Sequence, residues 1–143
     1  MILNKFYKIP SGPTVAFDVD DTLLMWDLPE GVSPDDERIV TVKCRGFSER
    51  LIPNQYNVDL LKKMASRGHA IIVWSAGGSD WAEAAVKALK LEKYVSVVSG
   101  KLTYFIDDIS DPSKIIGKHG YFDFFGNRDD EIYPSKKTNG EEK

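Results

Sequence analysis

The chain has little cysteine, little histidine and no long apolar run, and each shortage excludes a class of protein. Its 143 residues include one cysteine and two histidines. The single cysteine, Cys44, can form neither an internal disulfide nor a cysteine-built zinc site, so a reducing, cytoplasmic location is expected. No stretch approaches the roughly 18 apolar residues of a membrane span. Residues 1–10 lack an apolar run and a small-residue cleavage site, so we expect no signal peptide and no membrane partner.

The chain also lacks a large excess of positive or negative charge, and this limits the partners that it can bind. Lys and Arg total 19 while Asp and Glu total 22, giving a net charge of −3 at pH 7. Proteins that follow a long duplex nucleic acid need a basic surface, so we expect no such partner, whereas a small anion stays compatible. The length suits one domain. We expect this domain to span residues 1–128 and to be followed by a mobile, charge-rich tail at 129–143. The sequence is compatible with a monomer or an oligomer.

Short apolar, β-branched runs predict buried strands at 14–19, 70–74, 94–98 and 102–106. Apolar residues at helical spacing predict two helices between them. The first has Asn57 as its N-cap and Gly68 as its stop, and the second is capped by Ser79 or Asp80. Alternating strands and helices predict an α/β fold in which right-handed crossovers build a parallel sheet sandwiched by helices.

Residues 38–52 break this alternation and predict a β-hairpin inserted after the first strand, spanning about 36–53, with its turn near Arg45 and Gly46. Its cations allow two interpretations. They form either a solvated face or a flap over a cleft that meets a phosphorylated substrate. The cations are Lys43, Arg45 and Arg50, and the expected partners on a solvated face are Glu37 and Glu49.

Polar side chains follow every predicted strand, at the sheet edge where α/β proteins bind their ligands. In strand order they are Asp18, Asp20, Asp21 and Thr22; then Ser75; then Lys101; then Asp107 and Asp108. Because strand side chains alternate, Asp18 and Asp20 are expected to point into one cleft.

Carboxylates crowded at one edge repel each other unless a proton or a cation lies between them. Oxygen ligands without histidine or cysteine suit Mg²⁺, which would also neutralise an approaching phosphate. The candidate metal ligands are Asp18, Asp20, Asp107 and Asp108, with Asp111 as a supporting group.

A phosphate site is predicted beside these acids. Ser75, followed by Ala76 and a glycine pair at a helix N-terminus, can donate to phosphate oxygens. Lys101 supplies a point charge that binds phosphate. Asp20, near a phosphorylated Asp18, could protonate the leaving alkoxide and then deprotonate water.

These groups, in this order and each at the end of a predicted strand, resemble the four motifs of the haloacid dehalogenase-like (HAD) hydrolase superfamily over residues 14–111. The resemblance implies a three-layer, Rossmann-like core with Asp18 as nucleophile and Asp20 as general acid and base. It also implies phosphate binding by Ser75 and Lys101. Mg²⁺ would be held by Asp18, the backbone carbonyl of Asp20 and Asp107, with Asp108 nearby or acting through water.

An aspartate two residues after the nucleophile distinguishes the phosphomonoesterases of this superfamily from its dehalogenases and transport ATPases. Asp20 therefore points to phosphate-ester hydrolysis. One departure is that Leu102 follows Lys101 where many relatives have proline, and Lys93 is an alternative for the lysine role. An EF-hand calcium loop is excluded, because its sixth and twelfth positions would be Leu23 and Pro29.

Between Asp20 and Ser75 there is room for the hairpin and one helix only, so no large cap is expected. An open site suits bulky substrates, and Trp26 and Trp81 could stack on a nucleobase or serve as core or rim aromatics. The sequence thus predicts a Mg²⁺-dependent phosphomonoesterase with an aspartyl-phosphate intermediate, acting on nucleotides or polynucleotide ends. The alternatives are a phosphatase of sugar or protein phosphates, a solvated acidic turn, and a non-catalytic phosphate-binding module.

Overall fold

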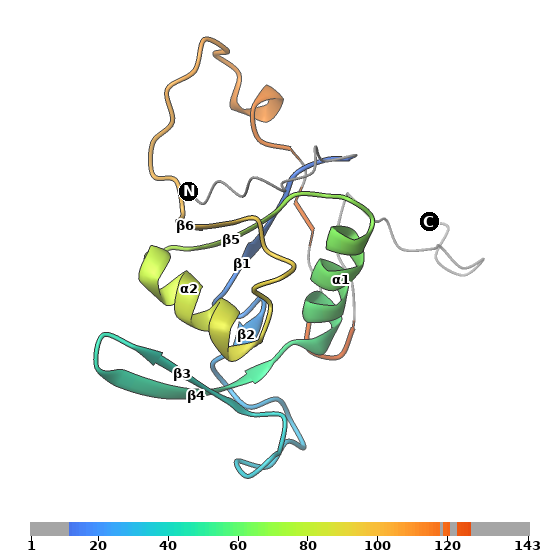
Figure 1. The fold of residues 1–143 in the computed structure, drawn as a ribbon, viewed down its shortest axis with the longest axis vertical. Coiled ribbons are helices and arrows are strands. Elements are labelled where there is room, and N and C mark those ends of the chain that lie inside the picture. The colour runs from blue at the N-terminus through green and yellow to red at the C-terminus, as the bar shows by residue number, and fades with distance from the viewer. Residues whose placement is uncertain (1–11, 118, 121–122, 127–143) are drawn as a thin grey trace, which may run out of the picture.

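The computed structural model in Figure 1 describes residues 12–117, 119–120 and 123–126. The expected tail at 129–143 lies outside these residues. The elements in chain order are β1 (Val15–Asp18), β2 (Leu24–Met25), β3 (Val40–Cys44), β4 (Phe47–Pro53), α1 (Gln55–Ser66), β5 (Ile71–Ser75), α2 (Ser79–Ala88), β6 (Val97–Gly100) and the short 3₁₀ helix η1 (Pro112–Lys114).

A parallel sheet in the order β1-β5-β6 forms the centre of the fold and confirms the α/β class. Strand β1 pairs with β5 from Val15 opposite Ile71, and β5 pairs with β6 from Ile72 opposite Val97. Strand β6 begins three residues later than predicted, because Tyr94 is in a turn in which its N–H donates to Leu91 O over 2.9 Å. The later start brings position 101 directly to the end of β6.

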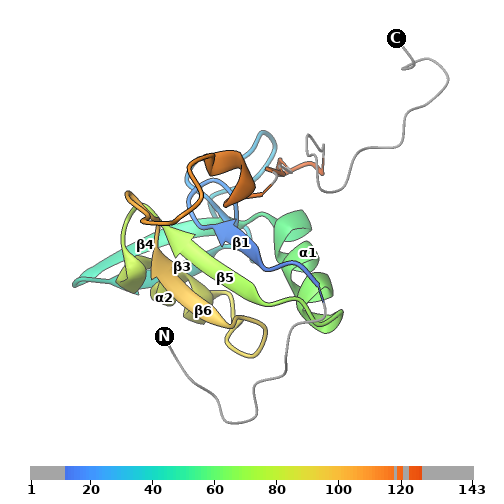
Figure 2. The same cartoon turned by 90° about the horizontal axis from the view of Figure 1, so that it is seen from above.

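Helices α1 and α2 lie on one face of this sheet, so the described residues form two layers of the expected three-layer arrangement. Seen from above in Figure 2, the strands lie in front of α1 and α2. The chain visits β1, β5 and β6 in spatial order, so both right-handed crossovers move in the same direction and place their helices on the same side. A crossover in the opposite direction, which would place its helix on the other face, is absent from the described residues.

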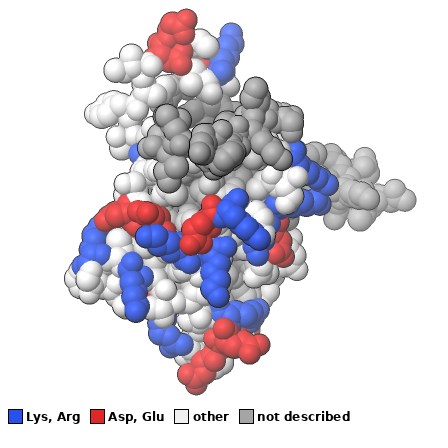
Figure 3. Space-filling model, viewed as in Figure 1, with Lys and Arg blue, Asp and Glu red and all other residues white. Residues whose placement is uncertain are grey.

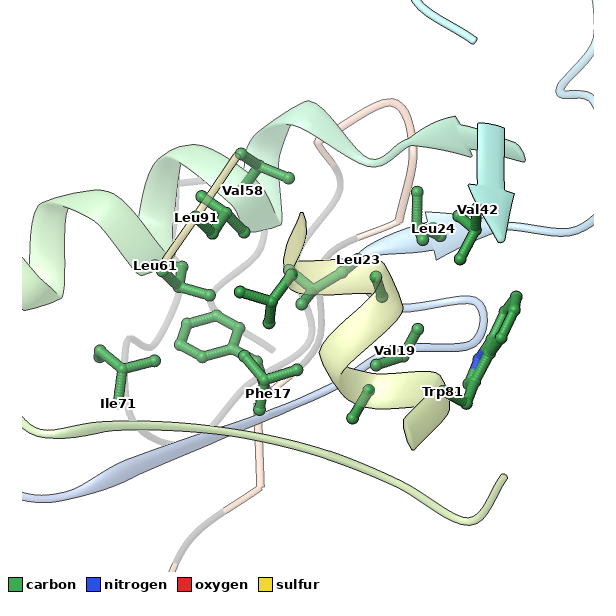
Figure 4. Packing of buried hydrophobic residues seen from close by; sticks show 14 of the residues in the cluster. Phe17, Val19, Leu23, Leu24, Val42, Val58, Leu61, Ile71, Trp81 and Leu91 are labelled. Atoms are coloured by element: carbon green, nitrogen blue, oxygen red, sulfur yellow. The ribbon is translucent and has the colours of Figure 1, made fainter. Parts of the chain in front are cut away.

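The main core lies between the sheet and these helices (Figure 4). Alternate strand residues such as Phe17, Ile71 and Val73 are buried there against Leu61 of α1 and the apolar face of α2. Such burial is the largest favourable contribution to folding. It fixes the direction in which each strand ends, and therefore where the strand-end side chains lie.

The helix N-termini differ from the expectation in their caps. Asn54, not Asn57, caps α1, and its side chain accepts a hydrogen bond from the Asn57 N–H. Asn57 is buried, and its side-chain amide donates to Thr22 O over 2.9 Å, which ties α1 to the loop after β1. Helix α2 has Gly78 as its N-cap and no side-chain cap from Ser79.

The predicted hairpin is confirmed. Strands β3 and β4 are antiparallel and are joined by a two-residue turn in which Arg45 and Gly46 have φ of 53° and 78°. Positive φ at both positions is the geometry that matches the twist of a hairpin. Strand β2, which the sequence did not reveal, pairs with β4 and links the hairpin to the loop after β1. In Figure 1 the hairpin lies beside α2.

The predicted fourth strand is wrong for the described structure. Residues 102–106 form no strand, and Tyr104 and Ile106 are almost fully exposed. The parallel ladder ends with the Lys101 N–H donating to Ser75 O over 2.9 Å, after which the chain leaves the sheet. An apolar run forms a strand only where a neighbouring strand accepts its hydrogen bonds, and the run alone does not supply that neighbour. None of the helices in the described part of the chain is long and apolar enough to cross a membrane.

Candidate functional site

The loop after β1 is built around one carbonyl. Val19 O accepts the N–H groups of Thr22, Leu23 and Leu24, at 2.9 to 3.2 Å, which folds the chain back at once. Asp21 has a φ of 58°, a left-handed conformation that aspartate tolerates better than most residues, and its carboxylate accepts the Trp26 N–H. Asp21 therefore shapes the loop and leaves the neighbouring acids to face the strand ends.

Asp18 and Lys101 meet at the ends of two strands that are not adjacent in the sheet. Asp18 Oδ1 lies 3.1 Å from Lys101 Nζ, and Asp18 Oδ2 accepts a hydrogen bond from Thr22 Oγ1 at 3.2 Å. The Asp18 side chain is one quarter exposed, at 25%, so an incoming molecule can reach it while its orientation is fixed on both oxygens.

Three donors hold the carboxylate of Asp20. Its Oδ1 accepts the indole N–H groups of Trp26, at 2.7 Å, and Trp81, at 3.0 Å, and its Oδ2 accepts Ser75 Oγ at 3.2 Å. The two indoles stack on each other with centroids 5.9 Å apart. Ser75 is fully buried at the end of β5, and its Oγ also accepts the Gly77 N–H. Asp20 is thus fixed in one position beside the end of the second strand.

The residues after β5 pack too closely for larger side chains. A Cβ at Gly77 would lie 3.2 Å from the Trp81 ring and 3.3 Å from Ser75 Oγ, so glycine keeps the Ser75 contact intact. Ala76, expected at the phosphate site, is exposed directly after Ser75. The structure therefore brings together Asp18, Asp20, Ser75 and Lys101, which we call the strand-end cluster.

The structure does not bring the second pair of acids into this cluster. Asp107 and Asp108 lie in the exposed segment after β6, and the described residues include no group of three or more acidic, histidine or cysteine side chains that could hold a metal ion. A backbone hydrogen bond from Ile109 lowers the pKa of Asp107. Asp111 is the N-cap of η1, where it accepts the N–H and hydroxyl of Ser113. The expected approach of these acids depended on the fourth strand.

Arg45 holds the hairpin against the start of α2. Its Nε donates to Asp80 Oδ2 over 2.7 Å, and its Nη2 donates to Gly77 O over 2.5 Å. The expected partners Glu37 and Glu49 are therefore wrong for Arg45. The other two hairpin cations differ: Arg50 donates to Pro34 O over 3.2 Å, and Lys43 is exposed on β3. Because local charge and strand alternation do not locate α2, the sequence could not identify Asp80.

This ion pair predicts a measurable pKa. The Arg45 guanidinium lowers the pKa of Asp80 from 3.8 to about 2, so the pairing is complete above pH 3.8 and is lost as the pH falls towards 2. We expect the carboxyl ¹³C resonance of Asp80 to titrate near pH 2 in the native protein and at a higher pH in Arg45→Ala, where the largest cause of the lowered pKa is gone. Arg50→Ala is the matched control and should leave the Asp80 titration unchanged. Equal midpoints in Arg45→Ala and the native protein would contradict the ion pair.

A pocket of about 430 Å³ opens between the hairpin and the strand-end cluster. We call it the hairpin pocket. Its lining comes from the loop after β1 (Asp20 and Trp26), from the hairpin (Cys44, Arg45, Phe47 and Glu49) and from the residues after β5 (Gly77 and Trp81). Burial is the main cause that raises the pKa of the Cys44 thiol, which keeps it neutral in this wall.

Positive and negative side chains are interspersed on the face of the molecule shown in Figure 3. Neither sign forms an extended stripe among the residues coloured there, in keeping with the net charge of −3. Comparisons with family models, with curated proteins and with solved structures give no match.

Sequence reasoning missed the polar role of the two tryptophans. Trp26 and Trp81 were expected to be either base-stacking surfaces or ordinary aromatics, whereas their N–H groups meet on one oxygen of Asp20. The only signal was that each follows a predicted strand end by a few residues. A donor pair aimed at one atom becomes visible only when the loop and α2 are placed in space.

Proposed function

We propose that the protein is a Mg²⁺-dependent phosphomonoester hydrolase in which Asp18 forms an aspartyl-phosphate intermediate. The observation that carries this proposal is the strand-end cluster, in which Asp18 contacts Lys101 and Asp20 contacts Ser75. A nucleophilic carboxylate, a second carboxylate for proton transfer, and a cation with a hydroxyl for phosphate are the groups that such a reaction needs. The resemblance of the same residues to HAD motifs supports this choice.

In the first step an Asp18 carboxylate oxygen attacks phosphorus. The new bond from Asp18 to phosphorus forms as the bond to the leaving oxygen breaks, and Asp20, carrying a proton, transfers it to that oxygen. Lys101 binds the non-bridging oxygens and offsets their negative charge, and the Ser75 hydroxyl, which donates to Asp20 before substrate arrives, joins it by turning to the phosphate. Lys101 already lies 3.1 Å from Asp18 Oδ1, so its charge is in place where the phosphate must arrive.

In the second step water attacks phosphorus and Asp20 removes one proton from it. The bond between Asp18 and phosphorus breaks, Asp18 regains its carboxylate, and inorganic phosphate leaves. Asp20 ends the cycle protonated, ready for the next substrate. The indole donors of Trp26 and Trp81 keep Asp20 in one orientation for both transfers, which suits a group that must act first as acid and then as base.

The donor chemistry of the cluster fits Mg²⁺. This ion is commonly bound through one or two carboxylates, with waters and substrate phosphate oxygens as its other ligands. The side chain of Asp18 and the main-chain carbonyl of Asp20 would hold it, since both Asp20 carboxylate oxygens already accept protein donors. When bound, Mg²⁺ would offset the charge that builds up on the phosphoryl oxygens.

A non-catalytic phosphate-binding module is less consistent with the cluster. Such a module would use Lys101 and Ser75, but two carboxylates beside the same site would repel the anion and weaken its binding. Carboxylates that oppose binding are explained when one reacts and the other moves protons. The two carboxylates therefore favour the hydrolase.

Metal removal gives the direct test of the proposal. We expect the full chain to hydrolyse p-nitrophenyl phosphate with Mg²⁺ present, to lose at least 100-fold in rate after treatment with EDTA, and to recover when Mg²⁺ is added back. Release of p-nitrophenolate is the measurement, and calcium add-back is the control for a nonspecific divalent effect. Absence of turnover by the Mg²⁺-loaded protein on this ester and on a panel of phosphorylated metabolites and nucleotides would overturn the proposal.

A further inference from the structure

The hairpin pocket begins at the residue that would protonate the leaving group. Asp20 belongs both to the strand-end cluster and to the lining of the pocket. In a phosphate ester bound at Asp18, the leaving oxygen must lie next to Asp20, so the group attached to that oxygen extends into the pocket. Its volume of about 430 Å³ lies within the range of about 300–1,000 Å³ usual for small-molecule sites.

Aromatic rings form much of this wall and their surfaces are accessible. Trp26 is 45% exposed, and Phe47, at the hairpin turn, is 73% exposed. The buried Trp81 stacks on Trp26, with ring centroids 5.9 Å apart, and restricts its movement. An exposed phenylalanine and a supported indole at one pocket offer flat apolar surfaces, which bind planar heteroaromatic rings by stacking.

The polar groups of the pocket select against an anion. Arg45 is the cation of the lining, but its guanidinium is engaged by Asp80 and Gly77 O. Glu49 is half-buried in the lining, and its carboxylate has no hydrogen-bond or ion-pair partner among the residues that the structure describes. A partly exposed carboxylate that no donor of the described residues engages can accept an N–H group from a bound molecule.

We propose that the hairpin pocket binds the base of a nucleotide, with a preference for bases that carry an exocyclic amine. The base would stack against Phe47 and Trp26, and its amine would donate to Glu49, as carboxylates accept the amine of cytosine in nucleic-acid recognition. A mononucleotide and the terminal nucleotide of an oligonucleotide share this chemistry. The inference deepens the proposed function and rests on it for the placement of the phosphate at Asp18.

Other bulky esters fit the pocket less well. A sugar phosphate has no flat ring to stack on Phe47 and Trp26. A bisphosphate would place its second anion near Glu49 without a free cation in the described lining to balance it. Stacking combined with a lone acceptor is therefore the feature that selects the base.

The test measures binding separately from turnover. In an Asp18→Asn background, calorimetry would compare cytidine monophosphate (3′ and 5′ isomers), uridine monophosphate and ribose 5-phosphate. We expect the better cytidine isomer to bind at least tenfold more tightly than ribose 5-phosphate, and more tightly than its uridine counterpart. Phe47→Ala should weaken cytidine monophosphate binding about tenfold and leave ribose 5-phosphate unchanged. Glu49→Gln should reduce the preference for cytosine over uracil about fivefold.

Phe125→Ala is the matched control, because Phe125 is another exposed phenylalanine, 58% exposed, outside the pocket lining. It should leave every affinity unchanged. A phosphorylated trinucleotide distinguishes a mononucleotide ligand from an oligonucleotide end. Tighter binding of the trinucleotide than of the mononucleotide would identify the oligonucleotide end. Equal affinity for cytidine monophosphate and ribose 5-phosphate, or no effect of Phe47→Ala, would overturn the inference even if the protein hydrolyses p-nitrophenyl phosphate. Base-dependent binding without hydrolysis would instead overturn only the proposed function.

Discussion

We expect Asp18→Asn to abolish phosphate-ester hydrolysis, with kcat falling about 10⁴-fold or more. An amide oxygen is a poor nucleophile, so no bond to phosphorus forms. Asparagine keeps the size of the side chain and an oxygen that can accept the Thr22 hydroxyl, so the loop after β1 should remain folded. The measurement is steady-state release of phosphate at saturating Mg²⁺, with thermal unfolding to check the fold.

The control for this variant is Asp27→Asn, which removes an exposed carboxylate from the same loop region without touching the strand-end cluster. Its kcat should stay within about twofold of the native value. Native-like activity in Asp18→Asn would show that the nucleophile lies elsewhere. A loss of activity accompanied by unfolding would be resolved with Asp18→Glu, which retains the charge and displaces the oxygen, and which should also be inactive.

Asp20→Asn should separate the two chemical steps. The variant has no proton to give, so we expect hydrolysis of an alkyl phosphate to fall by about 10²–10⁴-fold. The leaving group p-nitrophenolate needs no proton, so the first step on p-nitrophenyl phosphate should proceed. The second step lacks its base and should be slow. Rapid mixing should therefore show a burst close to one p-nitrophenolate per protein, followed by slow turnover.

The burst distinguishes a proton-transfer role from a structural one. If Asp20 only held Trp26, Trp81 and Ser75 in place, both esters would lose activity equally and no burst would appear. Acid trapping of radiolabelled phosphate on Asp20→Asn, and its absence from the double variant Asp18→Asn with Asp20→Asn, assigns the intermediate to Asp18. Equal losses on both esters without trapped phosphate would contradict the proposed role.

The parts of the fold that local sequence controls could be predicted. Strands β1 and β5 and the hairpin turn at Arg45 and Gly46 follow from side-chain alternation and turn chemistry, which act over a few residues. Strand-end geometry then brought Asp18, Ser75 and Lys101 together as expected, because the carboxyl ends of parallel strands share one edge.

The parts that depend on distant partners could not be predicted. The run at 102–106 has the composition of a strand, but composition does not say which strand would pair with it. The position of α1 and α2 on the same face, the one helical layer among the described residues, follows from the spatial order of the strands, which the alternation of elements leaves undetermined. The Arg45 contact with Asp80 joins residues 35 positions apart, and the Trp81 indole reaches Asp20 from 61 positions away.

The shared oxygen of Asp20 also makes the tryptophan fluorescence of the protein sensitive to this site. Indole emission responds to what its N–H donates to, and two of the three tryptophans donate to this single atom. The third, Trp74, lies half-buried on the opposite side of the sheet from the core, so Trp74→Phe would leave fluorescence from the pair alone. Any event that changes the protonation, the position or the neighbours of Asp20 would then shift the emission maximum of these two tryptophans, without an added label.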